Sequence, residues 1–143
     1  MGNISIKRML LGGLFAGLVI CLGEYIVGWL ILGEQWAEVV AEAGTGDLGA
    51  TQIASLAIIA LLYGVALIWM YAAIRPRFGP GPKTAIIAGF TMWVVAYFLV
   101  CAYVIVIGAY PAGLLIAAAV WGLFELPIAA VAGAWFYQES DAA

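Results

Sequence analysis

Two acidic residues lie inside long apolar runs of this sequence, where a carboxyl group is costly and its presence calls for an explanation. Glu24 falls in the first run and Glu125 near the middle of the last one. At the rise of an α-helix, Glu24 would lie roughly 12 Å from the outer end of its helix, and Glu125 about 18 Å from either end. An ionised carboxylate deep in a bilayer costs at least ~2.5 kcal/mol. Both side chains must therefore face protein or water, where they could bind protons or a cation.

Small residues accompany both glutamates. Faces of small residues let two helix backbones approach closely in a membrane, so we expect the first and last helices to pack together through them. The residues concerned are Gly13, Gly17 and Gly28 in the first run and Ala118, Gly122 and Ala129 in the last. This packing would bring Glu24 and Glu125 within a helical turn of each other. Like charges at such proximity leave at least one proton bound, so we expect Glu125 to be protonated near neutral pH.

Three further residues are predicted to complete this site. Pro127 has no N–H to donate to the carbonyl of Leu123, which would leave a free oxygen beside Glu125. Broken helices at mid-membrane depth recur at ion and substrate sites. Tyr63 and Tyr97 lie at similar depth in their own runs and could donate hydrogen bonds. The competing interpretation is structural: a protonated glutamate bonded to a tyrosine locks helices together, contributing about 0.6 kcal/mol.

The composition indicates what kind of protein must position these residues. Of the 143 residues, 67% are hydrophobic and 9% are charged, whereas soluble domains carry roughly 25% charged residues. Apolar runs of this length indicate membrane-spanning helices, and the alternating pattern of a membrane β-barrel is missing from the sequence. We therefore predict an all-α protein, a single membrane domain over 1–143 built as a four-transmembrane-helix bundle. The predicted spans are 9–32, 50–74, 84–108 and 113–137.

Basic residues give the expected orientation, because loops rich in Lys and Arg stay in the cytoplasm. All five basic residues precede the first span or lie between the second and third: Lys7, Arg8, Arg75, Arg77 and Lys83. The 33–49 connection has none. We expect both termini and the 75–83 loop to be cytoplasmic and the 33–49 loop to be external, in the bacterial inner (cytoplasmic) membrane. Arg75, Arg77 and Lys83 could also bind phospholipid headgroups, at about 1 kcal/mol per basic residue.

The two longer connections have distinct patterns. Prolines alternate with glycines in 75–83, so the helix is expected to break there. In 33–43 the apolar residues share one helical face, and Glu34, Glu38 and Glu42 share another, which predicts a short interfacial helix. Gly44 and Gly46 are expected to end it. The three carboxylates could attract a cation, but their pattern favours a solvated face.

Three stretches carry a resemblance: Gly23-Glu24 within 12–33, the sequence YAAIRPRFGPGPK within 71–85, and Glu125 within 121–137. On these features the chain resembles an uncharacterised family of small bacterial four-helix inner-membrane proteins. The resemblance covers the whole chain and implies the four-helix topology, with no activity attached. Small multidrug transporters also have four helices and a glutamate in the first, but the long 33–49 connection and the second glutamate depart from their pattern.

Three functional hypotheses follow from these features. The first is transport or conduction of protons or a cation by the intramembrane glutamates, which in a narrow bundle would require a homo-oligomer. The second is an accessory subunit that docks onto a partner membrane protein. The third, an enzyme acting on a lipid or quinone, is the weakest, because no nucleophile–base pair is visible. The chain lacks histidine, and Cys21 and Cys101 are not spaced as metal ligands, so we expect no metal, no cofactor and no catalytic residue. An acidic chain with few basic residues is not expected to bind nucleic acid.

Overall fold

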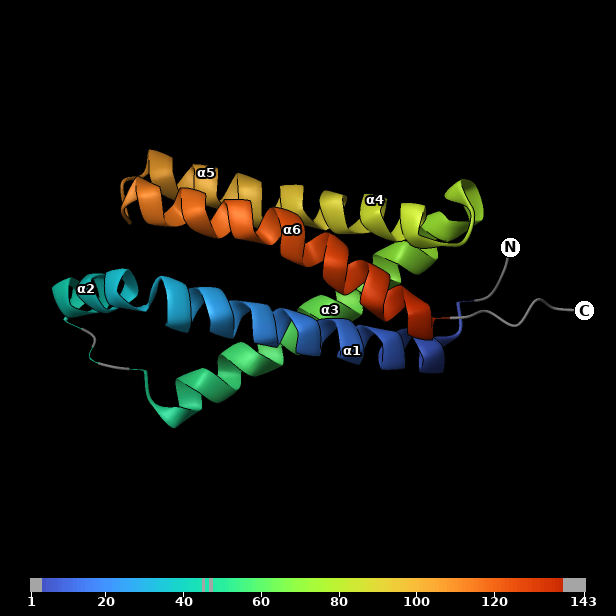
Figure 1. The fold of residues 1–143 in the computed structure, drawn as a ribbon, viewed down its shortest axis with the longest axis horizontal. Coiled ribbons are helices and arrows are strands. Elements are labelled where there is room, and N and C mark those ends of the chain that lie inside the picture. Colours follow the sequence, from blue (N-terminus) through green and yellow to red (C-terminus); the bar gives the residue numbers. More distant parts are fainter. Residues whose placement is uncertain (1–3, 45, 47, 138–143) are drawn as a thin grey trace, which may run out of the picture.

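The computed structural model describes residues 4–44, 46 and 48–137, and nearly all of them are helical (Figure 1). The described part contains no strand. The π-helical segments η1 and η2 continue the neighbouring α-helices without a break. The elements are α1 (Ile6–Tyr25), η1 (Ile26–Ile31), α2 (Gly33–Ala43), α3 (Ala50–Phe78), α4 (Pro82–Trp93), η2 (Val94–Phe98), α5 (Leu99–Val106) and α6 (Ala112–Phe136).

Four of the resulting helices are long and apolar enough to cross a membrane, as predicted: Ile6–Ile31, Ala50–Phe78, Pro82–Val106 and Ala112–Phe136. This architecture fits a multi-pass membrane protein. The short helix predicted before Gly44 is also present as α2, and Gly44 ends it with a left-handed φ of 66°. Position 46 is described and also has a positive φ, but its neighbours at 45 and 47 lie outside the described residues.

The break predicted over 75–83 is shorter than expected. Helix α3 continues through Arg75 and Pro76 to Phe78. A proline in the last turn removes only one hydrogen bond, and Gly79 N still donates to Arg75 O at 2.8 Å. The chain reverses instead at Gly79 and Gly81. Their φ angles of 84° and 118° are readily adopted by glycine and rarely by other residues.

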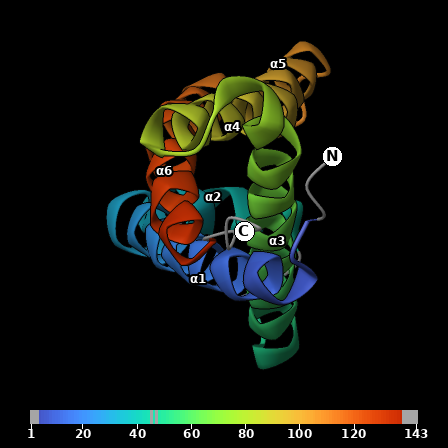
Figure 2. The same cartoon turned by 90° about the vertical axis from the view of Figure 1, so that its right-hand side faces the viewer.

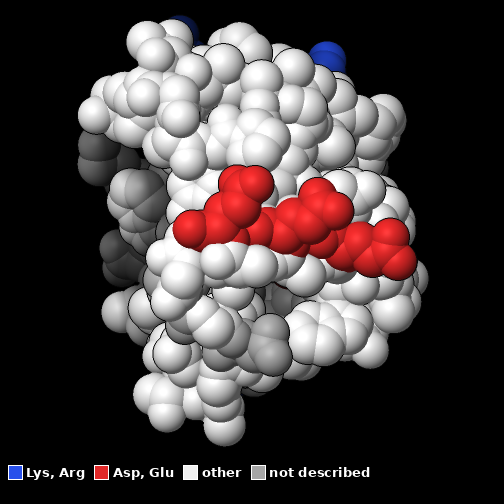
Figure 3. Space-filling view, turned by 90° about the vertical axis from the view of Figure 1, so that its left-hand side faces the viewer, with Lys and Arg blue, Asp and Glu red and all other residues white. Residues whose placement is uncertain are grey.

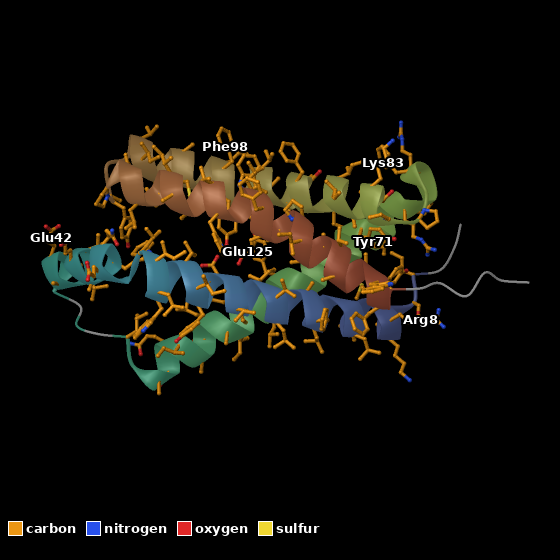
Figure 4. All side chains as sticks on the ribbon, in the orientation of Figure 1. Arg8, Glu42, Tyr71, Lys83, Phe98 and Glu125 are labelled. Atoms are coloured by element: carbon orange, nitrogen blue, oxygen red, sulfur yellow. The ribbon has the colours of Figure 1, made fainter. Side chains whose placement is uncertain are left out.

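The four spans form a bundle in which neighbours pack around a square (Figure 2). Helix α1 lies between α3 and α6, and α4 lies between the same two helices on the opposite side. The start of α1, the end of α6 and the 79–81 turn share one end of the bundle, with Arg8 and Lys83 beside them (Figures 1 and 4). Glu42 lies at the opposite end. The basic and acidic residues are therefore separated along the bundle, as the sequence predicts; which end is cytoplasmic stays a prediction.

The interface predicted between the first and last helices is wrong in its residues, although the two helices do pack together. Gly13 and Gly17 face α3: a Cβ atom on either would lie 2.6 Å from the Cα of Val65 or Leu61. Helix α6 meets the adjacent face of α1, where a Cβ on Gly12 would lie 2.5 Å from the carbonyl oxygen of Gly133.

Two further residues predicted for this interface, Gly28 and Gly122, lie elsewhere. Gly28 has open space beside it, and Gly122 faces the ring of Tyr97 in the third span. The reason is that α1 carries small residues on two neighbouring faces. Four-residue spacing alone cannot say which face meets which helix.

The inner half of the bundle, toward the 79–81 turn, is more closely packed than the outer half, toward α2, where Val27, Leu114 and Leu115 are buried. The buried core includes Leu67, Ile68 and Tyr71 of α3 and Leu126 of α6. By contrast, every residue of 50–59 in α3 is exposed, and none of η2 or α5 is buried. The outer turns of α3 diverge from the other helices (Figures 1 and 2).

We predict that Gly17→Leu destabilises the protein, because the new side chain would overlap the backbone of α3. Overpacking of this kind costs about 1–3 kcal/mol. Gly28→Leu is the matched control, since a side chain there meets open space. Thermal unfolding in detergent, followed by circular dichroism, should show a lower melting temperature for the first variant only. Equal melting temperatures would contradict the close α1–α3 contact.

Candidate functional site

Glu24, Tyr97 and Glu125 meet at the point where the packed half of the bundle gives way to the open half. The Tyr97 hydroxyl donates a hydrogen bond to Oε1 of Glu24. The same hydroxyl lies 3.4 Å from Oε2 of Glu125. The first residue comes from α1, the second from η2 and the third from α6, so three spans contribute to one cluster. The two glutamates predicted to approach each other are brought together, with Tyr97 between them.

The carboxyl group of Glu125 is held deep in the protein. Its side chain points from α6 toward α1 (Figure 4), and only 5% of the residue is exposed. A Cβ atom at Gly23 would overlap the carboxyl group, so glycine at that position of α1 makes room for it. Oε1 of Glu125 is buried and has no hydrogen-bond partner in the described structure. A buried, unpartnered oxygen is costly, which marks this carboxyl as a group able to accept a further donor.

Glu24 differs from Glu125 in its surroundings. The residue is exposed, although its carboxyl group reaches across the bundle to the third span. The exposure fits the divergence of the helices, because η1 makes few contacts with the other three spans. The cluster therefore joins one accessible carboxyl group to one buried carboxyl group.

Two π-helical segments flank the cluster, and nothing in the sequence pattern predicts them. Tyr97 lies within η2, and η1 begins two residues after Glu24. π-Helical turns are rare and occur frequently at functional sites. Gly122 of α6 faces the Tyr97 ring: a Cβ atom there would lie 2.7 Å from Cδ1. Because Gly122 has no side chain, the Tyr97 ring can pack directly against α6.

The other two residues predicted for the site take different positions. The Tyr63 hydroxyl is buried without a hydrogen-bond partner, and it is near enough to Glu24 to interact electrostatically. Pro127 faces away from α1: a Cβ atom on Gly89 of α4 would lie 2.7 Å from its nitrogen. The proline therefore packs against the third span; a role for the Leu123 oxygen stays a prediction.

The basic residues predicted to bind headgroups lie together at the inner end but are not equivalent. Arg77 and Lys83 are exposed, and Arg75 is partly buried. The guanidinium carbon of Arg75 lies 5.8 Å from the centre of the Tyr137 ring, an arrangement typical of a cation–π contact. Arg75 thus contributes to the closure of the inner end, whereas Arg77 and Lys83 face outward.

The outer end carries an acidic surface on α2. Glu34, Glu38 and Glu42 form a stripe along one side of this helix (Figure 3). Glu38 and Glu42 also line a cavity of about 350 Å³ between α2 and the beginning of α6. The positive end of a helix dipole attracts carboxylates, so this placement favours the docking of α2 beside the first turn of α6.

Comparison with protein-family models, with curated proteins and with solved structures finds no match to this chain.

We predict that Gly23→Ala displaces the Glu125 carboxyl group without unfolding the protein, because the overlapping atoms belong to the end of a flexible side chain. The infrared carbonyl band of Glu125, identified by its loss in Glu125→Gln, should shift in Gly23→Ala. Gly28→Ala, which meets open space, should leave it in place. An unchanged band in Gly23→Ala would show that Glu125 does not lie against α1.

Proposed function

We propose that this chain is a multi-pass protein of the bacterial inner membrane in which Glu24 and Glu125 bind protons or a cation during transport or conduction. One observation carries the proposal: the buried residue Glu125, with one carboxyl oxygen unpartnered in the described structure, shares a tyrosine hydroxyl with the exposed residue Glu24. Intramembrane carboxylates that face a bundle interior are typical of ion pathways and proton relays. Packing alone would not require one of the pair to stay accessible.

The two halves of the bundle support a pathway that is open from one side. The outer helices diverge above Glu24, whereas Leu67, Ile68 and Leu126 fill the inner half. An ion could reach the cluster from the outer end, and the packed half would prevent its leakage to the other side. Transport in this view requires a second arrangement in which the inner half opens.

The orientation that we propose places α2 outside the cell and both termini, with the 79–81 turn, in the cytoplasm. The support is the separation of charge along the bundle, with Arg8 and Lys83 at one end and Glu42 at the other (Figure 4). Arg77 and Lys83 would then meet the headgroups of the inner leaflet, where anionic lipids attract basic residues.

A second candidate function is that of an accessory subunit in a larger membrane complex. The observation that favours it is the outer part of α3, where residues 50–59 are exposed on every side and include Thr51, Gln52 and Ser55. Polar side chains in a membrane helix commonly pair with another helix. A partner subunit or a second copy of the chain would supply that helix.

We predict that Glu125→Gln abolishes proton-driven flux in proteoliposomes while preserving the fold, because Gln keeps the size of the side chain but cannot exchange a proton. Glu34→Gln on the exposed face of α2 is the control and should retain the parent's flux. A pH-sensitive dye inside the vesicles reports flux under an imposed potential. A parent protein that conducts no better than Glu125→Gln would contradict transport and favour the accessory role.

We predict that single cysteines at 36–43 react with a membrane-impermeant thiol reagent from outside the cell, in a background from which Cys21 and Cys101 have been removed. A cysteine in place of Lys83 should react only after the membrane is opened. The reverse pattern would overturn the orientation.

A further inference from the structure

We infer that the ion handled by this site is the proton, and that the hydroxyl group of Tyr97 passes it between Glu24 and Glu125. This inference rests on the proposed transport function and names its substrate and its relay. The observation behind it is one hydroxyl group in contact with an exposed carboxyl group on one side and a buried carboxyl group on the other.

The space around the carboxyl groups fits a proton better than a larger ion. The Glu125 carboxyl is packed against Gly23, and the Tyr97 ring is packed against Gly122. The cluster's side chains offer five oxygen atoms, two from each carboxyl group and one from Tyr97, fewer than the six that Mg²⁺ or the six to eight that Ca²⁺ takes from protein and water together. The cavity beside α2 and a second one near Thr51 and Gln52 lie at the outer end of the bundle. A proton needs no cavity, because it travels along existing hydrogen bonds.

The geometry also directs the proton through Tyr97. Oε1 of Glu24 and Oε2 of Glu125 are the two oxygens that face the hydroxyl group. A proton on either of them therefore points at the tyrosine oxygen. The carboxyl groups of Glu24 and Glu125 are also within hydrogen-bond reach of each other, so direct exchange between them is the alternative that the test must separate from the relay.

The relay step conserves atoms and charge. A protonated Glu24 donates its O–H hydrogen to the Tyr97 oxygen, while the hydrogen already on that oxygen passes to the Glu125 carboxylate. Glu24 becomes the carboxylate, Glu125 becomes the acid, and the tyrosine is neutral before and after the step. Rotation of the new O–H bond about the bond from Cζ to the oxygen resets the relay.

The groups facing this relay come from four spans. They are Cys21 of α1, Tyr63 of α3 and Trp121 of α6, together with the three members of the cluster. Tyr63 has a buried hydroxyl without a partner, so a small movement would let it donate to Glu24 and hold the carboxylate after proton transfer. None of these facing groups carries a positive charge, so a bound proton is the simplest way to lower the negative charge of the site.

The test measures proton flux in proteoliposomes containing the full-length protein. Tyr97→Phe keeps the ring against Gly122 but lacks the hydroxyl, and its flux should fall at least tenfold. Tyr103→Phe is the matched control: the same change in the same span, at an exposed tyrosine outside the cluster. Flux equal to the parent's in Tyr97→Phe would overturn the relay and leave transport by direct exchange between the carboxyl groups. A parent without flux would instead overturn the proposed function.

A second pair of variants tests the relay with its hydroxyl in place. Gly122→Ala adds a Cβ atom 2.7 Å from the Tyr97 ring, whereas Gly113→Ala in the same helix meets open space. The displaced ring should lower the flux of Gly122→Ala severalfold and leave that of Gly113→Ala unchanged. The infrared carbonyl band of Glu125 should shift in both Tyr97→Phe and Gly122→Ala, because the acid loses a hydrogen bond. A band that stays in place in both variants would overturn the contact, whatever the flux.

Discussion

Burial of the Glu125 carboxyl group costs free energy unless its oxygens meet donors or a proton. Several features of the bundle provide the space and the hydrogen-bond donor that this carboxyl group needs. Gly23 leaves space for the carboxyl group in α1, and Gly122 leaves space for the ring of Tyr97. The π-helical segment η2 holds Tyr97 where its hydroxyl can reach both glutamates. The same contact ties the third span to α1 across the bundle, in a region where the helices otherwise diverge.

The contrast between the two halves of the bundle follows from where the small residues lie. Close crossings at Gly12, Gly13, Gly17 and Gly133 all fall in the inner half, where the helix backbones nearly touch. Among the described residues beyond Glu24, no glycine of α1 or η1 makes such a contact; the outer turns of α3 are exposed, and no residue of α5 is buried. Bundles that are packed at one end and open at the other can change conformation by rocking of the helices about the packed end. The carboxyl cluster lies at the boundary, where such a movement would alter its access to water.

Sequence reasoning predicted the fold to within a few residues, because long apolar runs and clustered charges leave few alternatives for a membrane chain. It also anticipated that Glu24 and Glu125 would approach each other with a tyrosine as a possible donor, since buried carboxyl groups are expensive, and the structure brings Glu24, Tyr97 and Glu125 together; their functional role stays a prediction. Sequence reasoning did not predict which face of α1 packs against which helix. Gly13 and Gly17 were assigned to the wrong partner helix because α1 has two small-residue faces that spacing cannot distinguish. Pro127 packs against Gly89 of α4, a contact that its position in the sequence does not predict. The sequence gives no signal for the π-helical segments, and each of them changes the direction in which the following side chains point around the helix axis.

Solid-state NMR of the full-length protein in lipid bilayers tests the central claim most directly, that one hydroxyl group joins the two carboxyl groups. Carbon-13 labels on the glutamate carboxyl groups and on Cζ of tyrosine, assigned with Glu24→Gln, Glu125→Gln and Tyr97→Phe, would report their proximity and the protonation of each acid. The account predicts dipolar contacts from Tyr97 Cζ to the carboxyl carbons of both Glu24 and Glu125, with Glu125 in its neutral form. A Tyr97 in contact with neither carboxyl group, or a fully ionised Glu125 at neutral pH, would contradict it.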